Sequence, residues 1–212
     1  RPNLRLVPNP RPLQRLQRRE LKMELFKIFL AAVFVKNIVF IRFLALCSFV
    51  GMTSDVKKST GMGWAVLFVT VIATAATYPL YKLVLAPYNL GFLQTLLFIL
   101  VIASLVQLVE FYLKKSAPAL YSAMGVYLPL ITTNCAILAV TLDVIAADYT
   151  FIQSMVYSIG VAISYMLAMV LFAGLRERID IAPIPKYLKG TPILFIAAAL
   201  LSLAFGGFAG MI

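Results

Sequence analysis

Six apolar runs divide this sequence, and each is long enough to cross a lipid bilayer as a helix. A membrane-spanning helix needs about 20 predominantly apolar residues. Short connections separate the runs, which cover residues 27–50, 61–84, 90–113, 119–142, 150–174 and 191–211. Backbone groups in lipid must be hydrogen-bonded within the segment, and continuous apolar runs lack the alternation of barrel strands. We therefore predict an all-α integral membrane protein with six transmembrane helices.

The composition supports this prediction and excludes several kinds of site. The 212 residues are 62% hydrophobic and only 13% charged, and the mean hydropathy is +0.96, outside the usual range of a soluble domain. The absence of histidine excludes histidine zinc ligands, histidine haem ligands and a histidine general base. The sequence contains no Walker motif and no nucleophile elbow. Catalysis on a soluble substrate is therefore expected to belong to other chains.

The basic charge is concentrated in residues 1–22, which carry seven of the nineteen Lys and Arg residues and four prolines. We predict an extended, disordered or non-native extension here, because Met23 directly precedes the first apolar run. The alternative is a genuine arm resting on anionic lipid headgroups. The predicted domains are this extension and a six-helix membrane domain, 23–212.

The connections between the runs predict the orientation in the membrane. Basic residues in short loops mark the cytoplasmic side. Eight of them fall in the first, third and fifth connections: Lys57, Lys58, Lys114, Lys115, Arg176, Arg178, Lys186 and Lys189. The connection near Asp143 and Asp148 is acidic. We expect the odd-numbered loops to be cytoplasmic and both termini of the six-helix body to face outward.

Three spans followed by three spans match a 3+3 inverted repeat, with repeat one at about 23–114 and repeat two at about 115–212. In each half the first span, helices one and four of the body, carries a polar or charged interruption before a cysteine. RFLALCSF (42–49) contains Cys47, and YLPLITTNCA (127–136) contains Cys135. Pro129 deprives its helix of a hydrogen bond. Interrupted spans at equivalent places indicate a functional centre.

Cys47 and Cys135 are the only cysteines of the chain and therefore the candidate metal ligands. A single cysteine in an apolar helix is usually a small hydrophobic residue, and a disulfide between the two is a further alternative. Two thiolates are too few for a common iron–sulfur cluster, which takes four. If they bind metal, a second copy or a related subunit must supply the other two. Asn134 and Thr133 offer polar groups to a ligand sulfur.

Two basic residues, Lys36 and Arg42, lie within the first apolar run. A charge at the middle of a bilayer is costly and usually faces protein or water. These residues either mark the helix break and extend toward an interface, or have a functional role.

Three segments of the sequence resemble a known family: KNIVFIRFLALCSFVGM (36–52), GVYLPLITTNCAIL (125–138) and LFAGLRERI (171–179). They are similar to the RnfA (RsxA) subunits of the Rnf ion-translocating ferredoxin:NAD oxidoreductase complexes, which belong to the NqrDE/RnfAE membrane protein family, and to their relative NqrE. The resemblance extends from Met23 to Ile212. Ala45 departs from it, since many members have glycine there.

The resemblance implies an enzyme subunit, part of a redox-driven Na⁺ or H⁺ translocase in a bacterial or archaeal cytoplasmic membrane. It implies pseudo-symmetric pairing with the paralogue RnfE, beside RnfB, RnfC, RnfD and RnfG, and contact with ferredoxin and NAD only through other subunits. It also implies one [2Fe-2S] cluster, held by Cys47 and Cys135 of this chain and two cysteines of the partner. The alternative function is a stand-alone secondary transporter of an ion or solute, with incidental cysteines.

Overall fold

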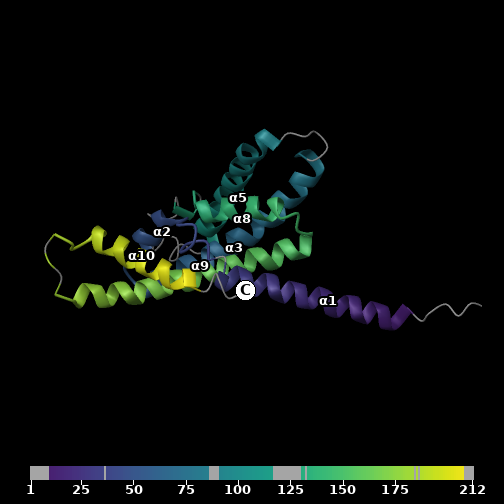
Figure 1. Cartoon of the computed structure of the whole chain (residues 1–212). Helices are drawn as coiled ribbons and strands as arrows, with labels where there is room; N and C mark the ends of the chain where they lie inside the picture. Colours follow the sequence, from purple (N-terminus) through teal and green to yellow (C-terminus); the bar gives the residue numbers. More distant parts are fainter. Residues whose placement is uncertain are drawn as a thin grey trace, which may run out of the picture.

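The computed structural model describes residues 10–35, 37–85, 91–116, 130–131, 133–183, 185 and 187–207. All regular secondary structure in these ranges is helical (Figure 1). The α-helices are α1 (Pro10–Leu30), α2 (Leu46–Met52), α3 (Val56–Leu80), α5 (Gln94–Ser116), α8 (Cys135–Ala146), α9 (Phe151–Ile181) and α10 (Thr191–Gly206). Two π-helical turns, η1 (Ala31–Val35) and η2 (Tyr81–Leu85), extend α1 and α3, and a 3₁₀ turn, η3 (Gly91–Leu93), precedes α5.

Three described helices are long and apolar enough to cross a membrane: Val56–Leu85, Gln94–Phe111 and Phe151–Ile181. They coincide with the second, third and fifth predicted spans. Two shorter apolar helices, Cys135–Ala146 and Thr191–Gly206, lie in the fourth and sixth. The fourth predicted span begins in a stretch, 117–129, that lies outside the described residues. The six-span inverted repeat therefore remains a prediction.

The beginning of the described chain differs from the extended arm expected for residues 1–22. Residues 10–22 form the first turns of α1, which projects from the remainder of the molecule (Figure 1). Pro10 and Pro12 lie in the first turn, where a missing N–H breaks no helical hydrogen bond. The Leu, Gln, Arg, Glu and Lys residues that follow favour helix. Residues 1–9 lie outside the described part.

The first predicted span is interrupted, as expected for helix one of the body. Helical structure ends at Val35, turns occupy residues 38–42 and 44–45, and α2 begins at Leu46. Asn37 stabilises this interruption, because its Oδ1 accepts hydrogen bonds from the backbone N–H groups of Val39 and Phe40, at 3.1 and 3.2 Å. Asn37 is completely buried. Irregular backbone at membrane depth is tolerated where protein surrounds it.

Side chains of α9 and α10 pair further carbonyls of this interruption. The Ser164 hydroxyl donates to the carbonyl oxygen of Val33 at 2.8 Å, and the Ser202 hydroxyl donates to that of Phe40. Arg176 Nη1 donates to the carbonyl oxygen of Val50, at 2.9 Å, near the end of α2. The helix break is therefore held in place by the second half of the chain.

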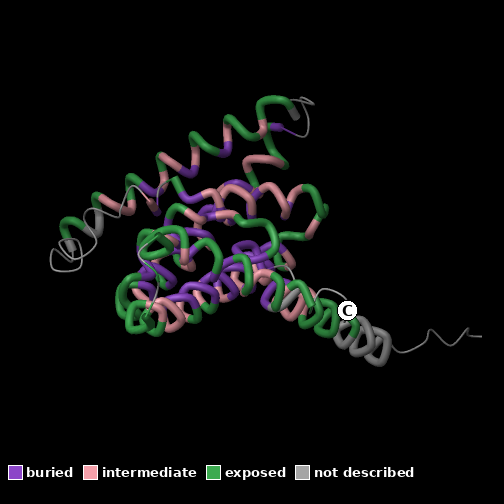
Figure 2. The backbone as a smooth tube through the Cα atoms, turned by 60° about the vertical axis from the view of Figure 1, so that its left-hand side comes forward, coloured by how far each residue is buried: buried purple, intermediate pink, exposed green. Residues whose placement is uncertain are grey.

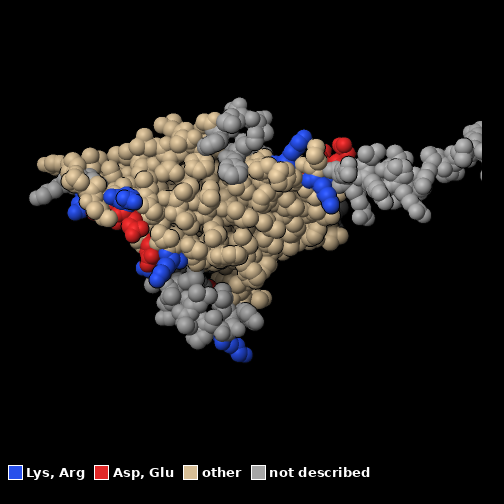
Figure 3. All heavy atoms as spheres, turned by 90° about the horizontal axis from the view of Figure 1, so that it is seen from below, with Lys and Arg blue, Asp and Glu red and all other residues tan. Residues whose placement is uncertain are grey.

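The packing of α3 against α9 forms the centre of the molecule (Figure 1). Gly63 allows this close approach, because a Cβ at that position would lie 2.6 Å from Cγ of Met166. Buried residues concentrate where the helices meet, while residues 20–24 of α1 are exposed (Figure 2). On the face shown in Figure 3, charged side chains lie toward the margins of a broad uncharged surface. Such a surface is typical of a protein that contacts lipid.

Candidate functional site

Cys135 occupies the first position of α8. The residue before it, Asn134, is the N-cap: its Oδ1 accepts a hydrogen bond from the backbone N–H of Ala136 at 3.0 Å. Asparagine is among the preferred N-cap residues, which explains why the helix begins here. The sequence predicts an interruption before Cys135, and in the structure these polar residues mark the start of a helix. Pro129 and Thr132 lie outside the described residues.

Cys47 is the second residue of the short helix α2, and it is exposed. The N-cap of α2 is Ala45, with a left-handed backbone conformation at φ 62°. Phe43 is also left-handed, at φ 51°. Two positive φ values within three residues turn the chain sharply before α2. The left-handed region favours glycine, which agrees with the glycine expected at position 45 from the family pattern.

The structure brings the two cysteine-bearing stretches together. The backbone N–H of Ala45 donates a hydrogen bond to Sγ of Cys135, at 2.8 Å, across 90 positions of sequence. The Ser48 hydroxyl, next to Cys47 in the sequence, forms a 2.8 Å hydrogen bond with the Tyr165 hydroxyl of α9. Both thiols are free, so the alternative of a disulfide between them is not realised. The described residues of RFLALCSF and YLPLITTNCA therefore meet at the Cys135 sulfur, while their role as joint metal ligands stays a prediction.

A cavity of about 240 Å³ lies between α5 and the beginning of α8. It is lined by Ile99, Ile102, Ala103, Thr133, Asn134, Cys135 and Leu138. One polar atom of these lining residues, Nδ2 of Asn134, is buried and has no hydrogen-bond partner among the described residues. The site thus combines a thiol, an unpaired amide donor and an apolar wall.

These residues fit one half of a thiolate metal site. A backbone N–H donor and a helix N-terminus both compensate the negative charge of a metal-bound sulfur. Cys135 has both, and the exposed Cys47 can be reached by another chain. Within the described ranges no group of three or more His, Cys, Asp or Glu residues lies together. A four-thiolate group at this place would therefore need ligands from a second subunit.

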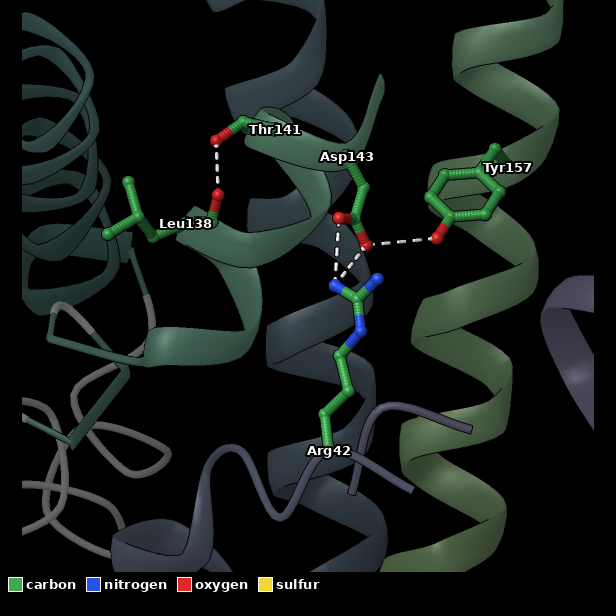
Figure 4. Close-up of polar contacts among 5 residues, drawn as sticks. All are labelled: Arg42, Leu138, Thr141, Asp143 and Tyr157. Atoms are coloured by element: carbon green, nitrogen blue, oxygen red, sulfur yellow. Dashed lines mark hydrogen bonds and ion pairs between the residues drawn. The ribbon is translucent and has the colours of Figure 1, made fainter. Parts of the chain in front are cut away.

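Arg42, in the turn before α2, forms an ion pair with Asp143 of α8 (Figure 4). Its Nη1 lies 2.8 Å from both carboxylate oxygens, and the Tyr157 hydroxyl of α9 donates to Oδ2 at 3.2 Å. We expected Asp143 in an acidic connection, which is wrong, because α8 continues to Ala146. The one sequence signal for this ion pair is that Arg42 and Asp143 carry opposite charges and lie in or beside the two interrupted spans. Lys36, its candidate neighbour, is outside the described residues.

Comparison with known proteins identifies the family. The family model described as "Rnf-Nqr subunit, membrane protein" matches residues 25–212. A relative from Syntrophotalea carbinolica, named as a subunit of the ion-translocating oxidoreductase complex, is 52% identical to this chain over 188 residues. That match covers 89% of this chain and 97% of the relative.

Two further relatives carry more specific names. One from Acetobacterium woodii, named as a subunit of the Na(+)-translocating ferredoxin:NAD(+) oxidoreductase complex, is 51% identical over 89% of this chain and 98% of the relative. One from Clostridium ljungdahlii, named as a subunit of the proton-translocating ferredoxin:NAD(+) oxidoreductase complex, is 46% identical over 87% and 96%. With a family model that matches nearly the whole chain and relatives at this identity, the chain belongs to the Rnf-Nqr family of membrane protein subunits.

Proposed function

We propose that this chain is the RnfA subunit of an ion-translocating ferredoxin:NAD oxidoreductase complex and that it relays electrons across the membrane. Relatives that carry the corresponding subunit name, matched over nearly their whole length, support the first part. The hydrogen bond from the Ala45 N–H to Cys135 Sγ carries the second part, because it joins the only two cysteine-bearing stretches at one site. The coupled ion is Na⁺ in the name of one relative and H⁺ in that of another.

The proposed cofactor is a [2Fe-2S] cluster with two ligands, Cys47 and Cys135, from this chain. Such a cluster takes four cysteine ligands, so the paralogous subunit RnfE supplies the other two in this proposal. When bound, the cluster would accept and release one electron at a time. Cys47 is exposed and Cys135 is partly buried, an arrangement suited to a site at the edge of one subunit that a second subunit completes.

Groups of this chain would compensate the negative charge of such a site. The Ala45 N–H already donates to Cys135 Sγ, and Cys135 begins α8, where the helix dipole favours negative charge. The apolar residues Ile102 and Ala136 are buried beside it. Buried surroundings of this kind control solvent access and hence the reduction potential of a metal group.

We also propose the 3+3 inverted repeat, with both termini of the six-helix body facing outward. Two features support it. The second helices of the two halves, α3 and α9, pack together. A helix also begins at the cysteine of one half, Cys135, and one residue before the cysteine of the other, Cys47. Inverted halves on either side of a central site provide a route to alternating access. RnfB, RnfC, RnfD and RnfG would hold the remaining cofactors and contact ferredoxin and NAD.

Because the proposed cluster needs two ligands from the RnfE paralogue, the function can be tested by comparing the single chain with the pair. The chain is purified alone and together with its RnfE paralogue, and both samples are assayed for iron, sulfide and the electron paramagnetic resonance signal after reduction. We expect one [2Fe-2S] cluster in the pair and none in the single chain. A full cluster in the single chain would contradict sharing, and a pair without iron would contradict the relay. Ion transport by the single chain in liposomes, without redox partners, would support the secondary-transporter alternative.

A further inference from the structure

In the side-chain amide of Asn134 the oxygen forms a hydrogen bond, whereas the nitrogen has no hydrogen-bond partner among the described residues. Its Oδ1 accepts from the backbone N–H of Ala136 at 3.0 Å and so caps α8. This cap fixes which end of the amide is which, because the NH₂ group cannot accept a hydrogen bond from a backbone N–H. Nδ2 must therefore point away from the helix, and there it is buried without a partner among the described residues.

An unpaired buried donor is destabilising, and native proteins seldom keep one without a reason. Asn134 is only 3% exposed, so bulk water does not compensate the loss. The cap itself uses only the oxygen, and it would be formed equally well by Asp or Ser, which have no amide donor. The amide group of Asn134 therefore needs an explanation other than the cap.

The surroundings of Asn134 indicate what the missing acceptor is. The cavity beside it is walled on the α5 side by Ile99, Ile102 and Ala103, which have no polar side-chain atoms. The Tyr165 hydroxyl is the neighbouring polar group that lies within reach of the Asn134 amide, but its geometry leaves Nδ2 unpaired, and its 2.8 Å hydrogen bond is with Ser48.

Cys135, the residue after Asn134, lines the same cavity. A group bound at Cys135 would therefore bring an acceptor to the unpaired Nδ2. The sulfur atoms of an iron–sulfur group are acceptors of this kind.

We propose that the Asn134 amide donates a hydrogen bond to a sulfur of the iron–sulfur group held at Cys135, and that this bond raises the reduction potential of that group. The proposal rests on the function proposed above. Reduction adds negative charge to the sulfurs, so a hydrogen-bond donor stabilises the reduced form more than the oxidised one. Asn134 acts here as a positioning residue, through the sulfur of the cluster.

The test uses the assembled complex with Asn134→Ala and Asn134→Asp. In each, the midpoint potential is measured by redox titration of the resonance signal that Cys135→Ala removes. A donor worth one hydrogen bond shifts the equilibrium between oxidised and reduced forms by about tenfold, or ~59 mV for a one-electron couple. We expect Asn134→Ala to lower the potential by about this amount. Asn134→Asp should lower it further, because the carboxylate keeps the cap but replaces the donor with a negative charge.

A second readout reports the hydrogen bond itself. After exchange into heavy water, the wild-type reduced cluster should show, besides the deuteron of the Ala45 N–H, coupling to a second exchangeable deuteron. Asn134→Ala and Asn134→Asp should both lack this second coupling. Asp55→Ala serves as the control, since Asp55 caps α3 through the N–H of Lys57 and has no part in the site. It should leave both the potential and the coupling unchanged.

The possible failures are distinguishable. Unchanged potential and unchanged deuteron coupling in a cluster-loaded Asn134→Ala complex would overturn the role of Asn134 and leave the relay intact. If Asn134→Ala does not assemble, Asn134→Asp retains the cap, and a potential equal to or above wild type would overturn the proposal. A wild-type complex whose signal survives Cys135→Ala would instead contradict the proposed function.

Discussion

The backbone N–H of Ala45 points at Sγ of Cys135 and lies 2.8 Å from it, although 90 positions separate the two residues. Each of them stands at the start of a helix, Ala45 as the N-cap of α2 and Cys135 as the first residue of α8. Two helix starts from different halves of the chain thus meet at one sulfur atom. The backbone conformation of Ala45 therefore determines whether its N–H can donate to the Cys135 sulfur.

The left-handed conformation of Ala45 makes this position sensitive to side-chain shape. For a residue with a Cβ, the left-handed backbone conformation costs roughly 1–2 kcal/mol of conformational free energy. β-branched residues adopt this conformation even more rarely. Ala45 is also completely buried. We expect Ala45→Val to destabilise the protein by about 2 kcal/mol or more, and Ala45→Gly to be tolerated. Thermal unfolding of the complex in detergent checks this, and equal melting temperatures for Ala45→Val and wild type would contradict it.

The Arg42–Asp143 ion pair predicts coupling between the two interrupted spans. The side chain of Arg42 is 51% exposed and that of Asp143 is 23% exposed, so solvent screens much of the attraction. Exposed pairs contribute about 0.2–1 kcal/mol. We expect a coupling energy in this range from a double-mutant cycle of Arg42→Ala and Asp143→Ala, measured by unfolding in mixed micelles. Additive effects of the two changes would show that the pair contributes nothing. Tyr157→Phe is the companion variant, because it removes one donor to Asp143 and keeps the ion pair.

The contact between α3 and α9 predicts a contrast between two glycines of α3. A Cβ at Gly63 would meet Cγ and Cβ of Met166 at 2.6 and 2.9 Å, whereas one at Gly61 would meet nothing within 4 Å. Gly63→Ala should therefore destabilise the protein by about 1–3 kcal/mol through overpacking. Gly61→Ala should be neutral or stabilise it by up to about 1 kcal/mol, because alanine favours helix. The two variants are compared by thermal unfolding, and similar behaviour would refute the close approach of the helices.

Much of the arrangement was predictable from local patterns in the sequence. Apolar runs of sufficient length located Val56–Leu85, Gln94–Phe111 and Phe151–Ile181. Polar residues before Cys135 indicated an interruption of the fourth span, and the structure shows that α8 begins there with Asn134 as its N-cap. The interruption before Cys47 was indicated by Lys36 and Arg42 within an apolar run. Each of these features depends on residues close together in the sequence.

Other features depend on groups that the sequence pattern does not reveal. The donor to Cys135 is a backbone N–H, which every residue except proline has. The amino-acid sequence therefore does not identify Ala45 as the donor. The pairing of Arg42 with Asp143 spans 101 positions and depends on how α8 packs beside the interruption. The helix over residues 10–22 was not predicted, because prolines usually break helices, although at the start of a helix they are tolerated.

The most direct test of the central claim is the iron–sulfur content of the purified pair of this chain and its RnfE paralogue, with Cys47→Ala, Cys135→Ala and both changes together. Ser104→Ala, on the exposed side of α5, is the control. We expect the wild-type and control pairs to show a [2Fe-2S] resonance signal with matching iron and sulfide. Each cysteine variant that still assembles should lose all three. A pair that keeps its full signal, iron and sulfide after both cysteines are replaced would contradict the account.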